Sequence, residues 1–240
     1  MAIREYIAER IARGQKMLAV LIDPEKADAS RLDALCPLIN DANPDFLFVG
    51  GSTGTQIEEV VRALRQRTSV PVVLFPGNVS QFTPTADALL VLSLLSSRNP
   101  EFLIGAQVRA ARAIQDSGID TLSVGYILVD GGRASSVQQT TGSEPLTKTD
   151  DILATAVAAE LLGFQSVYLE AGSGAKTPVS VSVIEAVRAK LRIPLIVGGG
   201  IRTTEQMLAA YRAGADIVVI GNHFESHPEQ IPLFCHARPK

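Results

Sequence analysis

A carboxylate, a phenol and three small turn residues stand within seven positions of one another in the segment SVYLEAGSGA (166–175). The segment predicts a short strand that runs into a glycine-rich turn. Because side chains alternate along a strand, Tyr168 and Glu170 would share one face. Gly172, Ser173 and Gly174 would leave backbone N–H groups open to a ligand. This combination is typical of a site for a hydroxyl-bearing anion; the alternative is a Glu170 that pairs with an arginine of a neighbouring loop.

Short apolar runs recur along the chain and predict the strands that would position this site. Continuous apolar runs are typical of parallel strands buried on both faces. They lie at 17–24, 44–51, 70–77, 86–95, 121–129, 166–174, 193–201 and 215–222. Segments with helical spacing lie between most of them, at 28–40, 53–68, 99–117, 148–163, 179–191 and 203–214. The alternation predicts an α/β fold, a TIM (β/α)₈ barrel that occupies 1–240 as a single domain. A doubly wound open sheet is the alternative, disfavoured because no early strand–turn–helix carries G-x-G-x-x-G.

Three segments depart from a regular barrel pattern. Residues 78–85 connect the third and fourth runs and are too few for a crossover helix, so we expect a short irregular link there. Residues 130–148 form a long polar rim loop after the fifth strand, either a mobile lid or a solvated loop. Residues 1–15 repeat isoleucine at helical spacing and predict an amphipathic helix packed on the body.

The predicted carboxyl ends of the strands carry small, polar and acidic residues, and in a barrel these ends converge on one mouth. The seventh and eighth ends, where barrels commonly bind phosphate, supply Gly199, Gly200, Gly221 and Asn222. Either cluster alone could serve only a tight turn, but the pair favours a phosphate site. We expect Arg202, next to this turn, to pair with a carboxylate outside the mouth.

Asp23 ends the first strand, across the predicted mouth from the glycines. One carboxylate together with hydroxyls and substrate phosphates is a common way to hold Mg²⁺. Ser52, at the end of the adjacent strand, could complete the set; the competing interpretation is a capping aspartate and a turn serine. Apolar residues near the mouth could line a hydrophobic groove or belong to the core: Phe75, Phe82, Leu92 and Leu94.

Composition narrows the partners and the compartment. The net charge is −3 and there is no run of lysine and arginine, so nucleic acid is not an expected partner. Cys36 and Cys235 stand in no metal-type spacing and favour free thiols in a reducing cytoplasm. The charged N-terminus resembles neither a signal peptide nor a membrane span.

Seven motifs, in order and spacing, resemble the geranylgeranylglyceryl phosphate synthase family, which includes the PcrB-type prenyltransferases. They are LIDPEK, VGGST, LFPGN, VGYILV, YLEAGSGA, IVGGGIR and IGNHFE, and the resemblance runs from about Met17 to Glu225. The resemblance implies a TIM barrel without the usual helix after the third strand. It also implies an enzyme that joins sn-glycerol 1-phosphate to a long-chain polyprenyl diphosphate of geranylgeranyl type and releases pyrophosphate with Mg²⁺. Because LIDPEK has Leu21 where many members have a basic residue, the chain resembles the second branch of the family.

Site residues follow from the resemblance by position. Asp23 and Ser52 match the magnesium positions. The glycerol phosphate segment matches Tyr168, Leu169, Glu170, Ala171, Gly172, Ser173 and Gly174, and the phosphate clasp matches Gly199, Gly200, Gly221 and Asn222. The family also implies a homo-oligomer, a dimer or a hexamer, and a lipid product of this kind implies transient contact with a membrane surface.

The expected mechanism uses Glu170 as the general base for the 3-hydroxyl of glycerol phosphate and Tyr168 to position that hydroxyl. A phosphate-binding isomerase or aldolase acting on a sugar phosphate is one alternative, disfavoured because no lysine lies inside a predicted strand. A non-enzymatic phosphate-binding module is the other, and it would not need Tyr168, Glu170 and Asp23 together.

Overall fold

Eight parallel strands close into a barrel in sequence order in the computed structural model, which describes residues 2–51 and 56–239. They are β1 (Met17–Ile22), β2 (Phe46–Val49), β3 (Val72–Leu74), β4 (Ala88–Leu94), β5 (Asp120–Leu128), β6 (Ser166–Glu170), β7 (Leu195–Gly198) and β8 (Ile217–Ile220). β1 pairs with both β2 and β8, which closes the ring. The predicted TIM barrel, with all of its predicted strands, is therefore confirmed.

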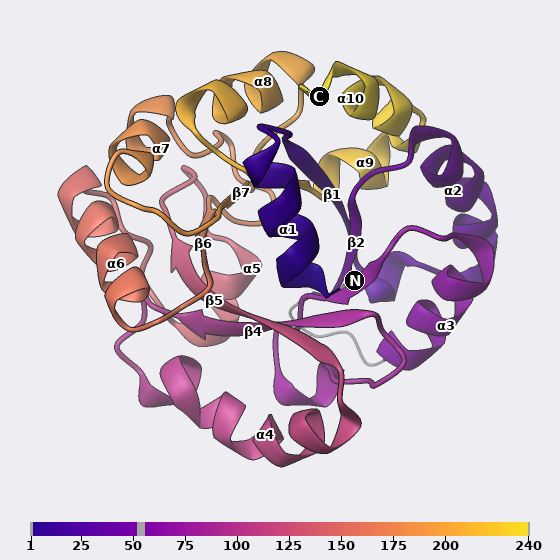
Figure 1. The fold of residues 1–240 in the computed structure, drawn as a ribbon, viewed down its shortest axis with the longest axis horizontal. Coiled ribbons are helices and arrows are strands. Elements are labelled where there is room, and N and C mark those ends of the chain that lie inside the picture. The colour runs from indigo at the N-terminus through magenta and orange to yellow at the C-terminus, as the bar shows by residue number, and fades with distance from the viewer. Residues whose placement is uncertain (1, 52–55, 240) are drawn as a thin grey trace.

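Helices surround the barrel on the outside, except α1, which lies over one of its ends (Figure 1). They are α1 (Ile3–Ala12), α2 (Ala29–Ala42), α3 (Ile57–Arg67), α4 (Ala106–Ser117), α5 (Ser136–Thr141), α6 (Thr149–Leu161), α7 (Val181–Arg188), α8 (Thr204–Ala213), α9 (Asn222–Ser226) and α10 (Ile231–Ala237). All the predicted helices form, although the expected start of α3 at 53 lies outside the described residues. The short α5, α9 and α10 were not predicted. No helix in the described ranges is both long and apolar enough to span a bilayer.

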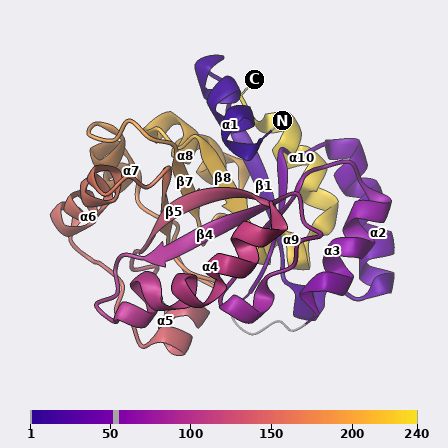
Figure 2. The ribbon, with the colours of Figure 1, turned by 60° about the horizontal axis from the view of Figure 1, so that its bottom comes forward.

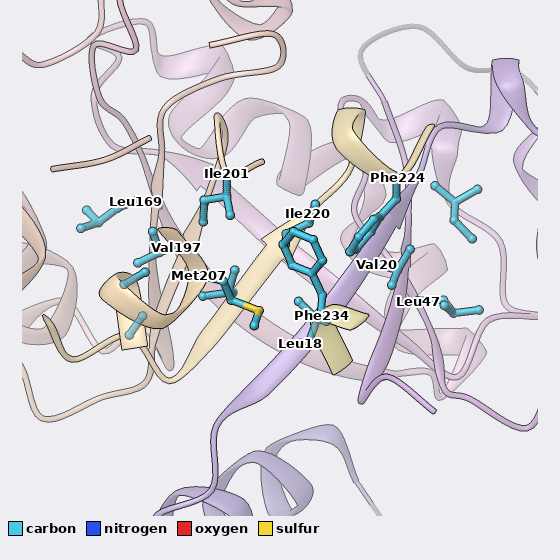
Figure 3. Close-up of a cluster of buried hydrophobic side chains, with 14 of the residues drawn as sticks. Leu18, Val20, Leu47, Leu169, Val197, Ile201, Met207, Ile220, Phe224 and Phe234 are labelled. Atoms are coloured by element: carbon cyan, nitrogen blue, oxygen red, sulfur yellow. The ribbon is translucent and has the colours of Figure 1, made fainter. Parts of the chain in front are cut away.

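Alternating side chains divide the core into two layers. Outward-facing strand residues pack beneath the helices, as Figure 3 shows for Leu18 and Val20 of β1 next to Phe234 of α10. Inward-facing residues fill the barrel, among them Tyr168. α1 lies across the amino-terminal end of the barrel, where its buried Ile3 and Ile7 join the inner layer (Figure 1). The predicted N-terminal amphipathic helix is thus confirmed, and the opposite end is left open for a site.

The connection from β3 to β4 contains only a 3₁₀ turn, Val79–Gln81, instead of a helix. Gln81 is buried and holds the turn in place: its Oε1 accepts from Gly77 N at 2.7 Å and its Nε2 donates to Gly51 O at 2.8 Å. The predicted short link is confirmed, and it leaves a gap in the ring of helices beside β4.

The segment 130–148, predicted as a long polar rim loop, contains a short helix. This helix is α5, which Ser135 caps by accepting from Gln138 N at 3.1 Å. Leu146 N donates to Leu128 O at 2.8 Å, and Lys176 N donates to Gly131 O at 2.8 Å. Turn-forming residues suppressed the helical signal, and these contacts attach the segment to the rim.

Candidate active site

Residues at the carboxyl ends of the strands line a single cavity of about 440 Å³. Of the residues predicted for the site, these line it: Asp23, Tyr168, Glu170, Ser173, Gly174, Gly199, Gly200, Gly221 and Asn222. Leu169 and Ala171 instead turn their side chains outward into the layer beneath the helices. Ser52 lies outside the described residues. The alternation along β6 therefore separates the reactive side chains from the structural ones.

Glu170 is a buried carboxylate at the end of β6. Its Oε1 accepts a hydrogen bond from Gly172 N at 2.6 Å. Burial raises the pKa of Glu170 above its ordinary value, while the neighbouring Tyr168 hydroxyl and the Gly172 N–H partly offset that rise. Within the described residues no arginine pairs with Glu170, so the ion-pair alternative is wrong. The raised pKa makes the Glu170 carboxylate a stronger proton acceptor than an exposed one.

Tyr168 is fully buried beside this carboxyl group, yet its hydroxyl makes no well-directed hydrogen bond to any described residue. Burial and the charge of Glu170 raise the pKa of Tyr168 well above its ordinary value, so the phenol stays protonated. A buried hydroxyl without a partner costs free energy unless a ligand supplies one. Because Tyr168 lines the cavity, its hydroxyl is accessible to a substrate oxygen there.

Aromatic rings surround the Tyr168 ring. Tyr126 packs edge-on at 5.2 Å between ring centroids and Phe75 lies at 5.5 Å. Sequence reasoning missed Tyr126 as a site residue. The signal was available, because Tyr126 in β5 lies opposite Tyr168 in the strand register and therefore faces the same cavity.

Two glycines at the end of β7 make room for the pair. A Cβ on Gly198 would lie 2.2 Å from the Tyr168 hydroxyl oxygen, and one on Gly199 would lie 2.4 Å from Glu170 Oε1. Gly199 also has a φ of 82° and Gly200 one of 71°, a backbone conformation that side-chain-bearing residues rarely adopt. The glycine run is thus required both by the turn and by the side chains that it faces.

Asn222 joins the loops that follow β6 and β8. Its side-chain Oδ1 accepts from Ser173 Oγ at 3.0 Å and from Gly174 N at 3.3 Å. Gly199 and Gly200 line the same wall of the cavity. The loops after β6, β7 and β8 together form a small polar corner, in which an anion can come close to the glycine backbone.

Asp23 stands at the end of β1 with its side chain 25% exposed. Its Oδ1 accepts from Glu25 N at 3.1 Å, and its Oδ2 lies 3.4 Å from Lys26 Nζ. The described residues contain no group of three or more histidine, cysteine or acidic side chains that could hold a metal. A single carboxylate in an open cavity fits Mg²⁺, which usually keeps waters and takes further oxygens from substrate phosphates.

An apolar arm of the cavity extends past β4 into the gap left by the missing helix. Phe75, Phe82, Leu92 and Leu94 all line it, as the groove interpretation predicted. The inner face of α4 covers the arm through Ala106, Ala110 and Ile114, and no residue of α4 is fully buried. Figure 2 shows α4 alongside β4. The polar corner and the apolar arm are therefore one continuous cavity.

Comparison with known proteins assigns the chain to a family. The model of the PcrB family matches residues 10–235. The chain belongs to the PcrB family. A geranylgeranylglyceryl phosphate synthase from Flavobacterium johnsoniae is 46% identical over 93% of this chain and 94% of its own length. One from Korarchaeum cryptofilum is 38% identical over 91% of this chain and 92% of its own length.

Solved structures agree with the PcrB assignment. The crystal structure of (S)-3-O-geranylgeranylglyceryl phosphate synthase from Thermoplasma acidophilum, in complex with its substrate sn-glycerol-1-phosphate, superposes with a TM-score of 0.92. It is 32% identical and covers 99% of this chain and 98% of its own. An N-acetylmannosamine-6-phosphate 2-epimerase from Clostridium perfringens, with a TM-score of 0.59 and 15% identity, shares the fold alone.

One expectation for this PcrB-family site is wrong. Arg202 pairs with no carboxylate in the described part of the chain. Its guanidinium donates to Ala175 O at 2.5 Å and to Lys176 O at 3.1 Å. Backbone carbonyl groups of the glycine-rich turn after β6 are partners that the sequence does not reveal, and these hydrogen bonds connect that turn to the β7–α8 loop.

Proposed function

We propose that the protein is a geranylgeranylglyceryl phosphate synthase-type prenyltransferase. It joins sn-glycerol 1-phosphate to a long-chain polyprenyl diphosphate, forms an ether-linked prenylglyceryl phosphate and releases pyrophosphate. The observation that carries the proposal is the continuity of one cavity. It combines the Glu170–Tyr168 pair, a glycine-walled polar corner and an apolar arm. A sugar phosphate isomerase would have no use for the arm.

The polar corner binds glycerol phosphate in this proposal. Backbone N–H groups of Ser173, Gly200 and Asn222 hold the phosphate, and the 3-hydroxyl lies toward Glu170. Glu170 takes the hydroxyl proton as the oxygen forms a bond to C1 of the prenyl chain. The bond from C1 to the diphosphate breaks, and pyrophosphate leaves with the electron pair. The raised pKa of Glu170 makes it a stronger base than an exposed glutamate near neutral pH.

Tyr168 contributes orientation and charge stabilisation. Its hydroxyl, which has no well-directed partner among the described residues, hydrogen-bonds the substrate oxygen. The rings of Tyr168, Tyr126 and Phe75 line the cavity, and aromatic rings close to the allylic carbon would stabilise positive charge on it. Phe75, Phe82 and Leu92 then receive the prenyl tail.

Asp23 and Ser52 would hold Mg²⁺. Bound there, the ion would neutralise negative charge on the departing pyrophosphate. We further propose that the enzyme is a cytoplasmic homo-oligomer that contacts membrane surfaces transiently. Family resemblance supports the oligomer, the free buried thiols of Cys36 and Cys235 support a reducing compartment, and the water-insoluble product supports the membrane contact.

Incubation with Mg²⁺, radiolabelled sn-glycerol 1-phosphate and prenyl diphosphates of several lengths tests the proposal. A labelled, organic-extractable product that resists the hydrolysis of esters identifies the ether linkage. The Glu170→Gln variant is the matched control, because it keeps the size of the side chain and removes the base. No labelled lipid with any prenyl donor would refute the proposal, and turnover of sugar phosphates by the same preparation would favour the isomerase alternative.

A further inference from the structure

Lys26 connects two carboxylates at the mouth of the barrel. Its ammonium nitrogen lies 2.8 Å from Glu225 Oε2 and 3.4 Å from Asp23 Oδ2. Asp23 follows β1, Lys26 ends the 3₁₀ turn Pro24–Lys26, and Glu225 belongs to α9 after β8. Closure of the barrel between β1 and β8 brings the three together. All three line the same cavity as Glu170.

Both oxygens of Asp23 are already engaged. Oδ1 accepts from Glu25 N and Oδ2 faces the Lys26 ammonium. A divalent cation on this carboxylate would place a second positive centre next to the ammonium, and like charges at such short range repel. Lys26 therefore has to leave Oδ2 before a metal can share Asp23. Its side chain is 47% exposed and has a flexible four-carbon stem, so it is free to move.

Glu225 keeps the ammonium at the mouth when it leaves Asp23. The contact with Glu225 is the shorter of the two, and Arg31 of α2 donates from its guanidinium to the Glu225 carbonyl oxygen, which anchors α9. Held there, the ammonium still faces the cavity in which a diphosphate would lie. The several negative charges of a diphosphate accommodate a metal ion and an ammonium side by side.

We propose that Lys26 is an exchangeable counter-ion, which neutralises Asp23 in the free protein and moves to the diphosphate when metal and prenyl donor enter. The inference rests on the proposed function for the identity of the diphosphate and for Asp23 as the metal carboxylate. Lys26 is then a positioning residue that couples two binding events. The metal binds weakly to the free protein and more tightly together with the diphosphate.

Mn²⁺ titrations of the full chain without substrate, followed by electron paramagnetic resonance, test the exchange. Lys26→Met should bind Mn²⁺ about fivefold more tightly than wild type, the lower end of typical coupling between two binding events. Lys26→Arg keeps the cation and should stay near the wild-type affinity. Arg31→Gln is the matched control, because it removes a positive charge that contacts Glu225 rather than Asp23. It should leave the affinity nearly unchanged.

Three results would overturn the proposal. They are a Lys26→Met affinity equal to or below wild type, an equal gain in Arg31→Gln, and Mn²⁺ binding that Asp23→Asn leaves intact. In turnover, Lys26→Met should raise the KM for the prenyl diphosphate and leave the KM for glycerol 1-phosphate unchanged. Thermal unfolding of each variant checks that it is folded. Because the titrations need no turnover, absence of a prenyl ether product would refute the proposed function while the Mn²⁺ ranking decides this inference separately.

Discussion

An alanine at position 198 would place its Cβ 2.2 Å from the Tyr168 hydroxyl oxygen and 3.0 Å from two carbons of the ring. Non-bonded carbon atoms pack best at roughly 3.5–4.0 Å, so the phenol would have to retreat by about 1 Å. Tyr168 is fully buried and its ring packs against Tyr126 and Phe75, so a retreat of this size would disturb both ring contacts. We expect Gly198→Ala to lower the free energy of unfolding by about 2 kcal/mol, the usual scale of overpacking. A displacement of this size should also lower turnover about 100-fold.

A double-mutant cycle with Tyr168→Phe isolates the cause. Removing the hydroxyl leaves only the ring carbons at 3.0 Å from the new Cβ, a contact that shifts of a few tenths of an ångström relieve. Gly198→Ala should therefore cost less than about 1 kcal/mol in the phenylalanine background, which corresponds to a coupling of about 1 kcal/mol or more. Urea unfolding measures the four stabilities, provided that the m-value stays constant.

Equal stability losses in the two backgrounds would refute the reasoning, because they would show that the hydroxyl is not what the alanine meets. Full turnover in Gly198→Ala would refute the functional half, since it would mean that the position of Tyr168 does not matter for catalysis. A radiolabelled glycerol phosphate assay at saturating prenyl diphosphate supplies that measurement.

Three further changes probe the base, the apolar arm and the amino-terminal end of the barrel. Glu170→Gln should lower turnover by roughly 10²–10⁴-fold, and unchanged turnover would remove Glu170 from the mechanism. Because burial raises its pKa, wild-type stability should fall as the pH rises from the ordinary carboxyl pKa through the raised value, and urea midpoints of the glutamine variant should lack that loss. Ala110→Phe narrows the apolar arm and should raise the KM of the longest prenyl donor roughly tenfold relative to short donors; equal effects on both would contradict the placement of the tail. Asp45→Asn removes the negative charge of a buried carboxylate that pairs with Arg10 and Arg238. The free energy of unfolding should therefore fall by about 3 kcal/mol, while turnover of the folded enzyme is retained.

Local patterns in the chain were sufficient for the barrel and for much of its mouth. Buried parallel strands need continuous apolar runs, and each run carries that information in its own residues. Parallel strands in a closed barrel direct their carboxyl ends to one side, so the strand-end residues Glu170, Gly199 and Asp23 could be assigned to one cavity without coordinates. The absence of a helix from the 78–85 link followed from the small number of residues in that segment alone.

Side-chain partnerships depended on the tertiary structure. Lys26 meets Glu225 only because β1 closes on β8, and no local pattern reports which rotamers two distant residues adopt. Arg202 donates to backbone carbonyl groups and not to a carboxylate, because the turn after β6 places those carbonyl groups within hydrogen-bonding distance. Sequence by itself therefore determined the strands, their order and the residues at their ends, since these depend on backbone periodicity and topology. Only the folded barrel decided which of those residues pair, because pairing depends on distances between segments far apart in the chain.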